Sequence, residues 1–305
     1  MAKSDSQTPA RISRLDYNAI RAKVVEILGV GSGTKGYGQP IINNEVVAGN
    51  DITAAQWTDL KNDIINVKLH QDGTTPSNIA SVSRGDVIFY GAGYPNTNYE
   101  TIANTLEANR FNLPTNQSTT TIATTRSTTG DWSTQAECTL TVTFGTVNEA
   151  RYFFNSGSKI NFTSDRTGGT DLPQNSAWTY LLDSAGTVKF GASTSTNTIH
   201  AYSLTDVYQT FYTINATSPY SSNFYKIEAK CDVTSNAAAT ARIFTFKITW
   251  RDAYVDSYPA VFPPDRVNGT LSIEIGETKP SGVLIPNGTF TVVSPTYSIT
   301  TISKT

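Results

Sequence analysis

Two pairs of aspartates have a spacing at which carboxylates could act together. Asp59 and Asp63 lie four positions apart, as do Asp252 and Asp256. Paired carboxylates carry out glycoside hydrolysis, and carboxylate oxygens also bind calcium. Asp59 and Asp63 fall one turn apart in a predicted helix, and we expect both to face solvent as ordinary surface charges. Asp252 and Asp256 lack the spacing of an EF-hand loop, so neither pair predicts a catalytic or calcium site.

The two histidines also lack partners for chemistry. His70 closes a predicted helix, where it complements the helix dipole, and His200 lies far away in a Thr-rich β region. Neither has ligands at zinc spacing or the partners of a catalytic triad. Asp171 and Asp183 are predicted to lie in loops, where structural Asx turns are their usual role. The sequence therefore predicts no enzyme, no metal site and no cofactor.

Cys138 and Cys231 each sit in an alternating strand pattern. A disulfide between them cannot be deduced from the sequence. The first residues of the chain are polar and lack the apolar core of a secretion signal. We therefore expect synthesis in a cytoplasm and two reduced thiols.

A glycine-rich connector over residues 29–40 contains a formal Gly-x-Gly-x-x-Gly match at Gly31, Gly33 and Gly36. In a dinucleotide-binding site this motif follows a strand and opens a helix. Here it follows a predicted helix and runs to a proline, so the context is reversed. A P-loop is excluded as well, because Tyr37 stands where that motif needs lysine. Two interpretations stay open: a flexible linker, or a backbone that packs closely on a neighbour.

Five tyrosines are the remaining candidates for recognition: Tyr202, Tyr208, Tyr212, Tyr220 and Tyr225. With Asn215 and Asn223 among them, they provide the ring stacking and hydrogen bonds that a sugar-binding loop uses. Tyrosine is also common in cores and protein interfaces, and we favour that interpretation over a glycan site.

The composition of the 305 residues limits the possible function classes. Hydrophobic residues make up 38% and charged residues only 16%, so Thr, Ser, Asn and Gln must cover much of the surface. With 10% aromatics, this is typical of a Thr-rich β protein. The formal charge of -2 argues against nucleic acid or an anionic membrane as the main partner. No apolar run approaches the ~20 residues of a membrane helix.

The N-terminal section, residues 1–115, has helical periodicity. Capping boxes are formed by Ser13 with Asp16 and by Thr53 with Gln56. Helices are predicted over residues 15–28, 56–69 and 101–109.

These helices are few and short, so we expect little core in this section by itself. It would dock on the β domain, on identical subunits or on a larger assembly. The predicted partner contacts are the apolar stripes of the first two helices: Tyr17, Ile20, Val24, Trp57, Leu60 and Ile64.

Residues 116–305 predict a mainly β fold, an antiparallel β-sandwich or jelly-roll-like domain. The low-complexity stretch 118–129 is either a linker or a Thr-rich edge strand. The strand patterns are clearest over 139–144, 241–250, 271–275 and 289–293. Asn268-Gly269 and Asn287-Gly288 are hairpin-turn dipeptides ahead of the last two. Residues 176–182 and 206–212 fit either a helix or a strand.

Three consecutive aromatics, Tyr152-Phe153-Phe154, follow a lone Arg151. As a strand, this run would place apolar surface on both faces. Asn155-Ser156-Gly157 then supplies turn chemistry, and residues 159–162 alternate polar and apolar side chains. We interpret residues 147–162 as a two-sided core strand and hairpin, since buried aromatics usually pack.

Six short motifs make a recognisable pattern: Gly36-Tyr37-Gly38-Gln39, Ile52-Thr53 to Trp57-x-x-Leu60, His70-Gln71-Asp72-Gly73, Ala150 to Gly157, Arg166-Thr167-Gly168-Gly169, and Gln174 to Trp178. The pattern resembles a family of virion structural proteins of tailed bacteriophages, especially marine and cyanobacterial phages. The resemblance covers the chain to about residue 255. Ser158 departs from it, because the family pattern has a second glycine there. No catalytic residue is carried over.

The resemblance implies a place in the virion: neck, tail, baseplate or fibre attachment. We expect a non-enzymatic structural protein that forms a homo-oligomer and contacts other virion proteins. The alternative is a host-surface, glycan-binding module of the adsorption apparatus that uses the five tyrosines.

Overall fold

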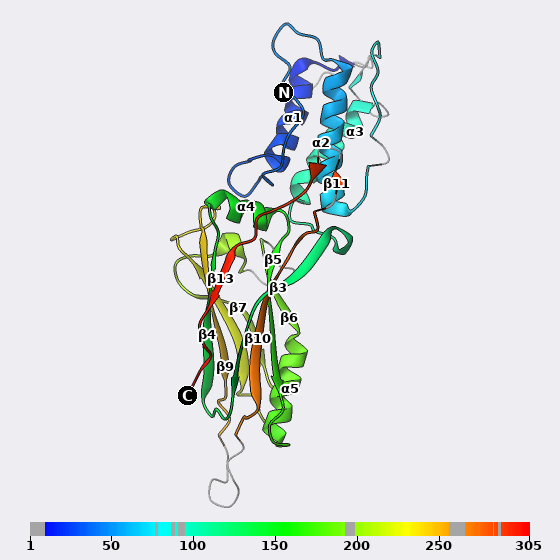
Figure 1. The fold of residues 1–305 in the computed structure, drawn as a ribbon. Helices are drawn as coiled ribbons and strands as arrows, with labels where there is room; N and C mark the ends of the chain where they lie inside the picture. The colour runs from blue at the N-terminus through cyan, green and yellow to red at the C-terminus, as the bar shows by residue number, and fades with distance from the viewer. Residues whose placement is uncertain are drawn as a thin grey trace, which may run out of the picture. The chain divides into compact units, whose positions relative to one another are not determined.

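The computed structural model describes residues 10–76, 79–86, 89–90, 95–192, 199–255, 266–282, 284–285 and 288–305. The chain folds into two compact units, each assembled from segments far apart in sequence. The first unit comprises Met1–Thr119, Arg151–Gly157 and Lys279–Val292. The second comprises Thr120–Ala150, Ser158–Thr278 and Val293–Thr305. Figure 1 shows α1, α2 and α3 in the first unit and the long strands in the second.

The three predicted helices of the first unit are confirmed as α1 (Arg14–Leu28), α2 (Ala54–Asp72) and α3 (Pro95–Ala108). Ser13 Oγ accepts a hydrogen bond from the Asp16 N–H, and the Asp16 carboxylate accepts one from the Ser13 N–H. Thr53 and Gln56 form the same reciprocal cap on α2. Gly73 ends α2 at a φ of 72°, a left-handed conformation that glycine adopts without strain.

The apolar stripes of these helices fill the unit's own core, which corrects the expectation that they contact other chains. All six side chains are at most 3% exposed: Tyr17, Ile20, Val24, Trp57, Leu60 and Ile64. Tyr17 and Tyr99 each pack edge-on against Trp57, with ring centroids 5.2 and 5.0 Å away. Side chains of α3 and the remote Phe290 complete this core. The section therefore has more core than its few short helices suggested.

Asp63 is fully buried, contrary to the expected solvent-exposed position. Its carboxylate accepts hydrogen bonds from the backbone N–H groups of Ile42 at 3.2 Å and Asn43 at 3.0 Å. The Asn43 side-chain amide donates a third bond. A buried carboxylate needs such donors, and here they fasten the segment just after the connector to α2. The spacing between Asp59 and Asp63 thus reflects packing rather than a paired carboxylate site.

The second unit is a sandwich of two antiparallel sheets, which confirms the predicted mainly β fold. One sheet has the order β3-β10-β5-β6, and the other β13-β4-β9-β8-β7, with β14 also pairing with β4. The strands are β3 (Ser118–Thr129), β4 (Gln135–Thr143), β5 (Lys159–Thr167), β6 (Thr187–Phe190), β7 (Gln209–Asn215), β8 (Phe224–Cys231), β9 (Ile243–Arg251), β10 (Thr270–Pro280), β13 (Thr296–Ile299) and β14 (Ser303–Lys304). The stretch 118–129 is therefore an edge strand rather than a linker.

Several other elements are short: β1 (Ala10–Arg11) pairs with β2 (Phe89–Tyr90), β11 (Leu284–Ile285) pairs with β12 (Gly288–Thr289), and η1 (Thr115–Gln117) and η2 (Ala201–Ser203) are 3-10 helices. The strand predicted over 289–293 is wrong beyond Thr289. The backbone of Thr291 instead bonds the side chain of Gln39, whose amide lies 2.8 Å from the Thr291 carbonyl.

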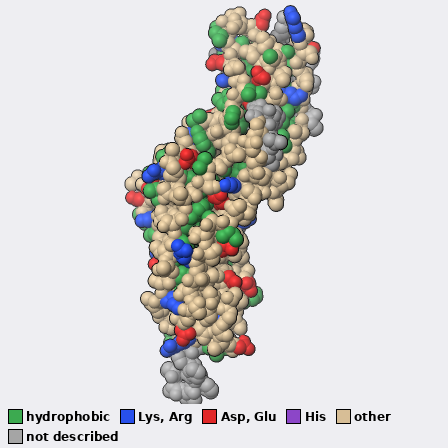
Figure 2. All heavy atoms as spheres, in the orientation of Figure 1, with side chains coloured by type: hydrophobic (Ala, Val, Ile, Leu, Met, Phe, Trp, Pro, Cys, Tyr) green, Lys and Arg blue, Asp and Glu red, His purple; other side chains and the backbone are tan. Residues whose placement is uncertain are grey.

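Aromatic side chains fill the space between the two sheets. Four phenylalanines pack here, with ring centroids 5.0 to 5.9 Å apart between the sheets: Phe162 and Phe190 from one sheet, Phe211 and Phe246 from the other. Trp250 Nε1–H donates to Ser164 Oγ across the same space, at 2.8 Å. Most polar side chains therefore face outward. On the face drawn in Figure 2, most atoms are tan, the colour of uncharged polar side chains and of the backbone, and the charged side chains are scattered singly.

Cys138 and Cys231 are both free and buried, in agreement with the expected reduced thiols. Cys138 of β4 lies opposite Ile248, and Cys231 of β8 lies opposite Phe244, both on β9. Strands two places apart in a sheet are about 10 Å apart, which a disulfide cannot span. Burial raises the pKa of the Cys138 thiol to about 12, so it stays protonated.

The aromatic run belongs to a helix, α4 (Val147–Asn155), so the strand predicted there is wrong. Thr146 and Glu149 form a capping box: the Glu149 N–H donates to Thr146 Oγ1 and the Thr146 N–H to the Glu149 carboxylate, both at 3.1 Å. Ala150, Phe153 and Phe154 have helical spacing, and all are buried. The capping box, which ends directly before this face, is the signal that outweighs a strand interpretation.

The strand predicted over 159–162 is confirmed as the start of β5, but it pairs with β10 and β6. No hairpin therefore forms with the aromatic run. The ambiguous stretch 176–182 lies in a helix, α5 (Pro173–Ala185), and the stretch 206–212 ends in β7.

Candidate functional site

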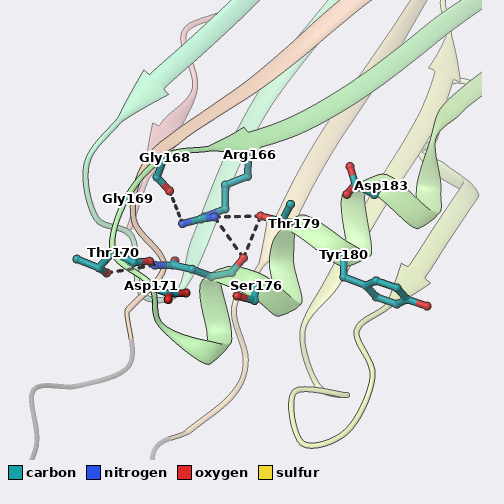
Figure 3. A pocket seen from close by; sticks show the side chains of 10 residues that line it. Arg166, Gly168, Gly169, Thr170, Asp171, Ser176, Thr179, Tyr180 and Asp183 are labelled. Carbon is teal, nitrogen blue, oxygen red and sulfur yellow. Dashed lines mark hydrogen bonds between the residues drawn. The ribbon is translucent and has the colours of Figure 1, made fainter.

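A pocket of about 450 Å³ opens on the second unit beside α5. The end of β5, the loop that follows it and one side of α5 supply its lining: Arg166, Gly168, Gly169, Thr170, Asp171, Asn175, Ser176, Thr179, Tyr180 and Asp183. Pro173 begins α5, because its fixed φ suits the first helical position. Figure 3 shows Arg166 reaching from β5 toward Thr179 on the helix.

Arg166 forms the base of this pocket and is only 6% exposed. Its guanidinium donates to Thr179 Oγ1 at 3.0 Å, to the Gly168 carbonyl at 3.0 Å and to the Asn175 carbonyl at 3.3 Å. Within the described chain its Nε has no hydrogen-bond partner. Burial lowers the pKa of this guanidinium, against the opposing effect of nearby Asp165. Arg166 therefore joins β5, its loop and α5, rather than presenting a free cation.

A second network closes the loop against the segment before β10. Asn268 Oδ1 accepts hydrogen bonds from the Thr170 N–H at 2.8 Å and the Asn175 amide at 2.9 Å. The Asn268 N–H donates in return to Asn175 Oδ1 at 3.0 Å. Gly169 lies so close that a Cβ there would stand 2.3 Å from Asn268 Oδ1. The predicted Asn-Gly turn therefore holds the pocket wall through its asparagine side chain.

The outer wall of the pocket carries the groups that a ligand could reach. Tyr180 is 62% exposed, and Asp171 and Ser176 also line the pocket. Asp183 lies on α5, so its predicted place in a loop is wrong. An aromatic face with carboxylates and a hydroxyl can stack on and accept hydrogen bonds from a polyhydroxylated ligand.

The five tyrosines proposed for glycan contact do not share one surface. Tyr202, Tyr220 and Tyr225 are at most 7% exposed, and Tyr225 stacks on Trp250 in the core. Tyr208 and Tyr212 are half-buried. The ring of Tyr208 lies near two ammonium groups, with Lys230 Nζ 4.9 Å and Lys247 Nζ 5.0 Å from its centroid. Three of the five are therefore unavailable for stacking on a sugar.

Of the second aspartate pair, Asp252 is buried and accepts a hydrogen bond from the Gln174 amide at the start of α5. Asp256 lies outside the described residues.

In the first unit, motifs that carry the phage resemblance meet one another. Asn155 of α4 donates a hydrogen bond to the Gly36 carbonyl at 3.0 Å. Gly38 lies against Tyr152, where a Cβ would stand 2.3 Å from the ring. Tyr37 between these glycines is fully buried. Of the two interpretations of the glycine-rich connector, the closely packed backbone is therefore confirmed.

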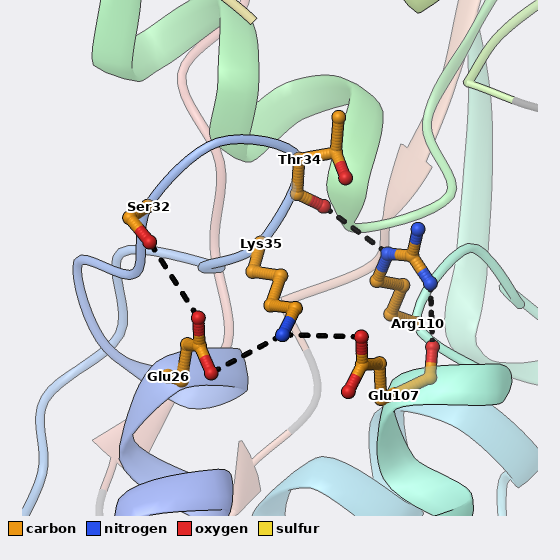
Figure 4. Close-up of polar contacts among 6 residues, drawn as sticks. All are labelled: Glu26, Ser32, Thr34, Lys35, Glu107 and Arg110. Carbon is orange, nitrogen blue, oxygen red and sulfur yellow. Dashed lines mark hydrogen bonds and ion pairs between the residues drawn. The ribbon is translucent and has the colours of Figure 1, made fainter. Parts of the chain in front are cut away.

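Figure 4 shows a polar cluster that fastens the same connector to α1 and α3. The Lys35 ammonium lies 3.2 Å from the Glu26 carboxylate and 3.1 Å from that of Glu107. Arg110 Nε–H donates to the Thr34 carbonyl at 3.1 Å. The hydrogen bond to Glu107 raises the pKa of Lys35. Water reaches all three charged groups, so the cluster orients the connector more than it stabilises the fold.

His70, also part of a matching motif, is buried at the end of α2. Its ring stacks on Phe290, with centroids 3.9 Å apart, and Tyr37 packs edge-on at 4.9 Å. Burial lowers the pKa of His70 to about 3, although a hydrogen bond to the Ser156 backbone acts in the opposite direction. The imidazole is neutral at pH 7, so the expectation that its charge complements the helix dipole is wrong.

This histidine makes the protein less stable at acid pH. The unfolded chain takes up a proton near the ordinary pKa of 6.5, whereas the folded state resists it down to about 3. The contribution of neutral His70 to the free energy of unfolding is therefore fully present above pH 6.5, and it is lost as the pH falls from 6.5 toward 3. Between pH 7 and 4.5 we expect wild type to lose about 2–3 kcal/mol more than His70→Phe, which cannot titrate. Urea unfolding at both pH values measures this, and parallel losses would contradict it.

Arg166→Lys is expected to lower the free energy of unfolding by about 2–3 kcal/mol, because lysine keeps the charge but leaves buried acceptors unsatisfied. Arg126→Lys on exposed β3 is the matched control and should change stability by less than about 0.5 kcal/mol. Urea unfolding of both variants checks this. Equal stability of the two would show that Arg166 does not hold the pocket together.

Among the described residues no group of His, Cys, Asp and Glu side chains could hold a metal ion. Within the same part of the chain no helix is long and apolar enough to cross a membrane. No protein-family model, curated protein or solved structure matches this chain.

Proposed function

We propose that this protein is a non-enzymatic structural component of a tailed-phage virion, in the neck, tail, baseplate or fibre attachment. It would act through a homo-oligomer and through contacts to other virion proteins. The observation that carries the proposal is what the matching motifs do in space: they bind parts of the chain's own backbone. The side chains of Asn155, Arg166 and Asn175 each donate to backbone carbonyl groups, that of Asn155 to Gly36.

Polar side chains that hydrogen-bond the chain's own backbone favour a structural role, because they make the fold rigid rather than bind a substrate. Arg166 has its Nη donors committed to Thr179, Gly168 and Asn175, and His70 is neutral and stacked. A catalytic group must instead be free to meet a substrate and exchange a proton at working pH. A Thr- and Ser-rich coat with few charges also suits a particle component that contacts several neighbours.

Purified particles of the phage that encodes this chain provide the test. We expect the protein at a fixed copy number by quantitative mass spectrometry, and density that fits each of its two units in a cryo-microscopy map. Deleting its gene should leave particles that lack that density and have reduced infectivity. If the protein is absent from purified particles, and deletion leaves them intact and infective, the proposal is wrong.

A second candidate, binding of a host-surface glycan, is favoured by the pocket beside α5. There Tyr180 exposes its ring, and Asp171, Ser176 and Asp183 supply acceptors in the same lining. The proposed glycan contact thus uses other residues than the tyrosines between 202 and 225, three of which are buried.

Binding of the purified protein to host envelope polysaccharide tests this second candidate. Tyr180→Ala should weaken binding by roughly 5–100-fold if the ring stacks on a sugar, as aromatic anchors commonly do. Tyr208→Ala, at a half-buried tyrosine that does not line the pocket, is the matched control. Equal binding by both variants, or no binding by wild type, would rule out a glycan site at this pocket.

A further inference from the structure

The pocket beside α5 is lined by polar residues and glycines, apart from the ring of Tyr180. Ser176, Tyr180 and Asp183 are exposed, and their spacing of four and three positions places them on one face of α5. Asp171, which is also exposed, lies in the loop before this helix. No residue that lines the pocket in the described chain has an aliphatic side chain. Protein partners anchor large apolar side chains in their pockets, whereas this lining suits a ligand rich in hydroxyl groups.

The strongest hydrogen-bond donors of the lining are used within the protein. Arg166 is only 6% exposed, and its two Nη atoms donate to three acceptors of the chain itself. The Asn175 amide donates to the Thr170 carbonyl at 2.8 Å and to Asn268 Oδ1 at 2.9 Å. A carboxylate, phosphate or sulfate group on a ligand needs a free cation or free amide donors. Neither Arg166 nor Asn175 can provide them, because both are committed to the fold.

The acceptors of the lining remain available to a ligand. Asp171 and Asp183 are exposed, and neither carboxylate forms an ion pair in the part of the chain that the structure describes. The lining thus carries two exposed negative charges, and its one positive charge, that of Arg166, is buried. Exposed carboxylates repel an approaching anion and accept hydrogen bonds from hydroxyl or ammonium groups. The lining therefore distinguishes ligands by their charge.

We propose that this pocket binds a glycan without negative charge, built from neutral or amino sugars, and that it excludes acidic glycans. The inference rests on the glycan site given above as the second candidate function, and it adds the class of sugar that the site accepts. The Tyr180 ring would stack on a sugar face, while Asp171 and Asp183 accept hydrogen bonds from hydroxyl or amino groups. A uronic acid, or a sugar with phosphate or sulfate, would instead bring an anion beside these carboxylates.

Host envelope polysaccharide that has been separated by anion-exchange chromatography tests this selectivity. The purified full chain should bind the non-retained fraction, which lacks negative charge, roughly 2–30-fold more tightly than the retained acidic fraction. This is the effect expected of two like-charge contacts at an exposed site. The difference should shrink at high salt, because ions screen exposed charges.

Removing the two carboxylates should reduce the discrimination. The double variant Asp171→Asn, Asp183→Asn should bind the acidic fraction roughly two- to tenfold more tightly than wild type does. Asp206→Asn is the matched control, because Asp206 is an exposed aspartate that does not line the pocket. It should bind both fractions as wild type does.

Adding a cation to the lining should have the same direction of effect. Ser176→Lys places an ammonium group on the exposed face of α5, and binding of the acidic fraction should rise roughly two- to fivefold. Ser184→Lys is the control for net charge, since Ser184 is an exposed serine of the same helix that does not line the pocket. An equal rise in both variants would show that overall charge, and not the pocket, governs binding.

Equal binding of the two fractions by wild type would overturn the inference. If Tyr180→Ala then still weakens binding, the glycan site itself stands without this selectivity. If neither fraction binds, both the inference and the glycan site are wrong. Loss of the protein from particles that carry the double aspartate variant would, in that case, assign the pocket to a basic segment of another virion protein. None of these results decides the virion role, which the content of purified particles tests separately.

Discussion

Phe153→Ala is expected to lower the free energy of unfolding by about 3–5 kcal/mol, because it removes a fully buried ring and leaves a cavity. Phe153 is 0% exposed on α4, and its ring packs edge-on against Phe154 with centroids 5.3 Å apart. Phe154→Ala should cost about as much, since that ring is 1% exposed. Both rings face the core because α4 is a helix; a strand would have directed them to opposite sides.

Urea or thermal unfolding of purified variants measures this effect. Val147→Ala, at the exposed start of the same helix, is the control and should change stability by less than about 0.5 kcal/mol. A large loss at only one phenylalanine would mean that the run faces two directions. If both alanine variants unfold like wild type, the aromatic face of α4 is not part of the core.

Gly36→Ala should be destabilising by about 2–5 kcal/mol, for two independent reasons. Gly36 has a φ of 98°, which an L-residue adopts only with strain of about 1–2 kcal/mol. Its Cβ would also stand 2.2 Å from the Val30 carbonyl oxygen. This obstacle is backbone and cannot rotate away, so the connector must shift, at a further cost of about 1–3 kcal/mol.

Gly33→Ala distinguishes the strain of a positive φ from the steric clash of the added Cβ. Gly33 also has a positive φ, of 53°, but its Cβ would meet nothing within 4 Å. It should therefore cost only about 1–2 kcal/mol. Chemical unfolding of the two variants side by side gives the difference, which measures how tightly the connector packs. Equal losses would mean that the connector can shift freely, as a flexible linker would.

Several residues of the candidate site could be singled out from the sequence, but their structural role could not be predicted from it. Arg166 and Asn175 stood out in the matching motifs, and Asn268 in a predicted turn. Their common role needed three-dimensional neighbours, since the network joins β5, α5 and the segment before β10. Tyr180 was missed because an exposed aromatic on a helix gives no pattern of its own.

The sequence by itself determined the features that depend on a few adjacent residues. Capping boxes at Ser13 and Thr53 set where α1 and α2 begin, because those hydrogen bonds close over three residues. Alternation and threonine content predicted the β-sandwich, because period and propensity are local properties.

Only the tertiary structure decided which side chains are buried and what they contact. Asp63 is buried because residues 42–43 bring it donors, and His70 is neutral because Phe290 covers it. The stripes of α1 and α2 face their own core because α3 and a C-terminal segment close over them. Burial is decided by segments remote in sequence, whose approach depends on the free energy of the whole fold.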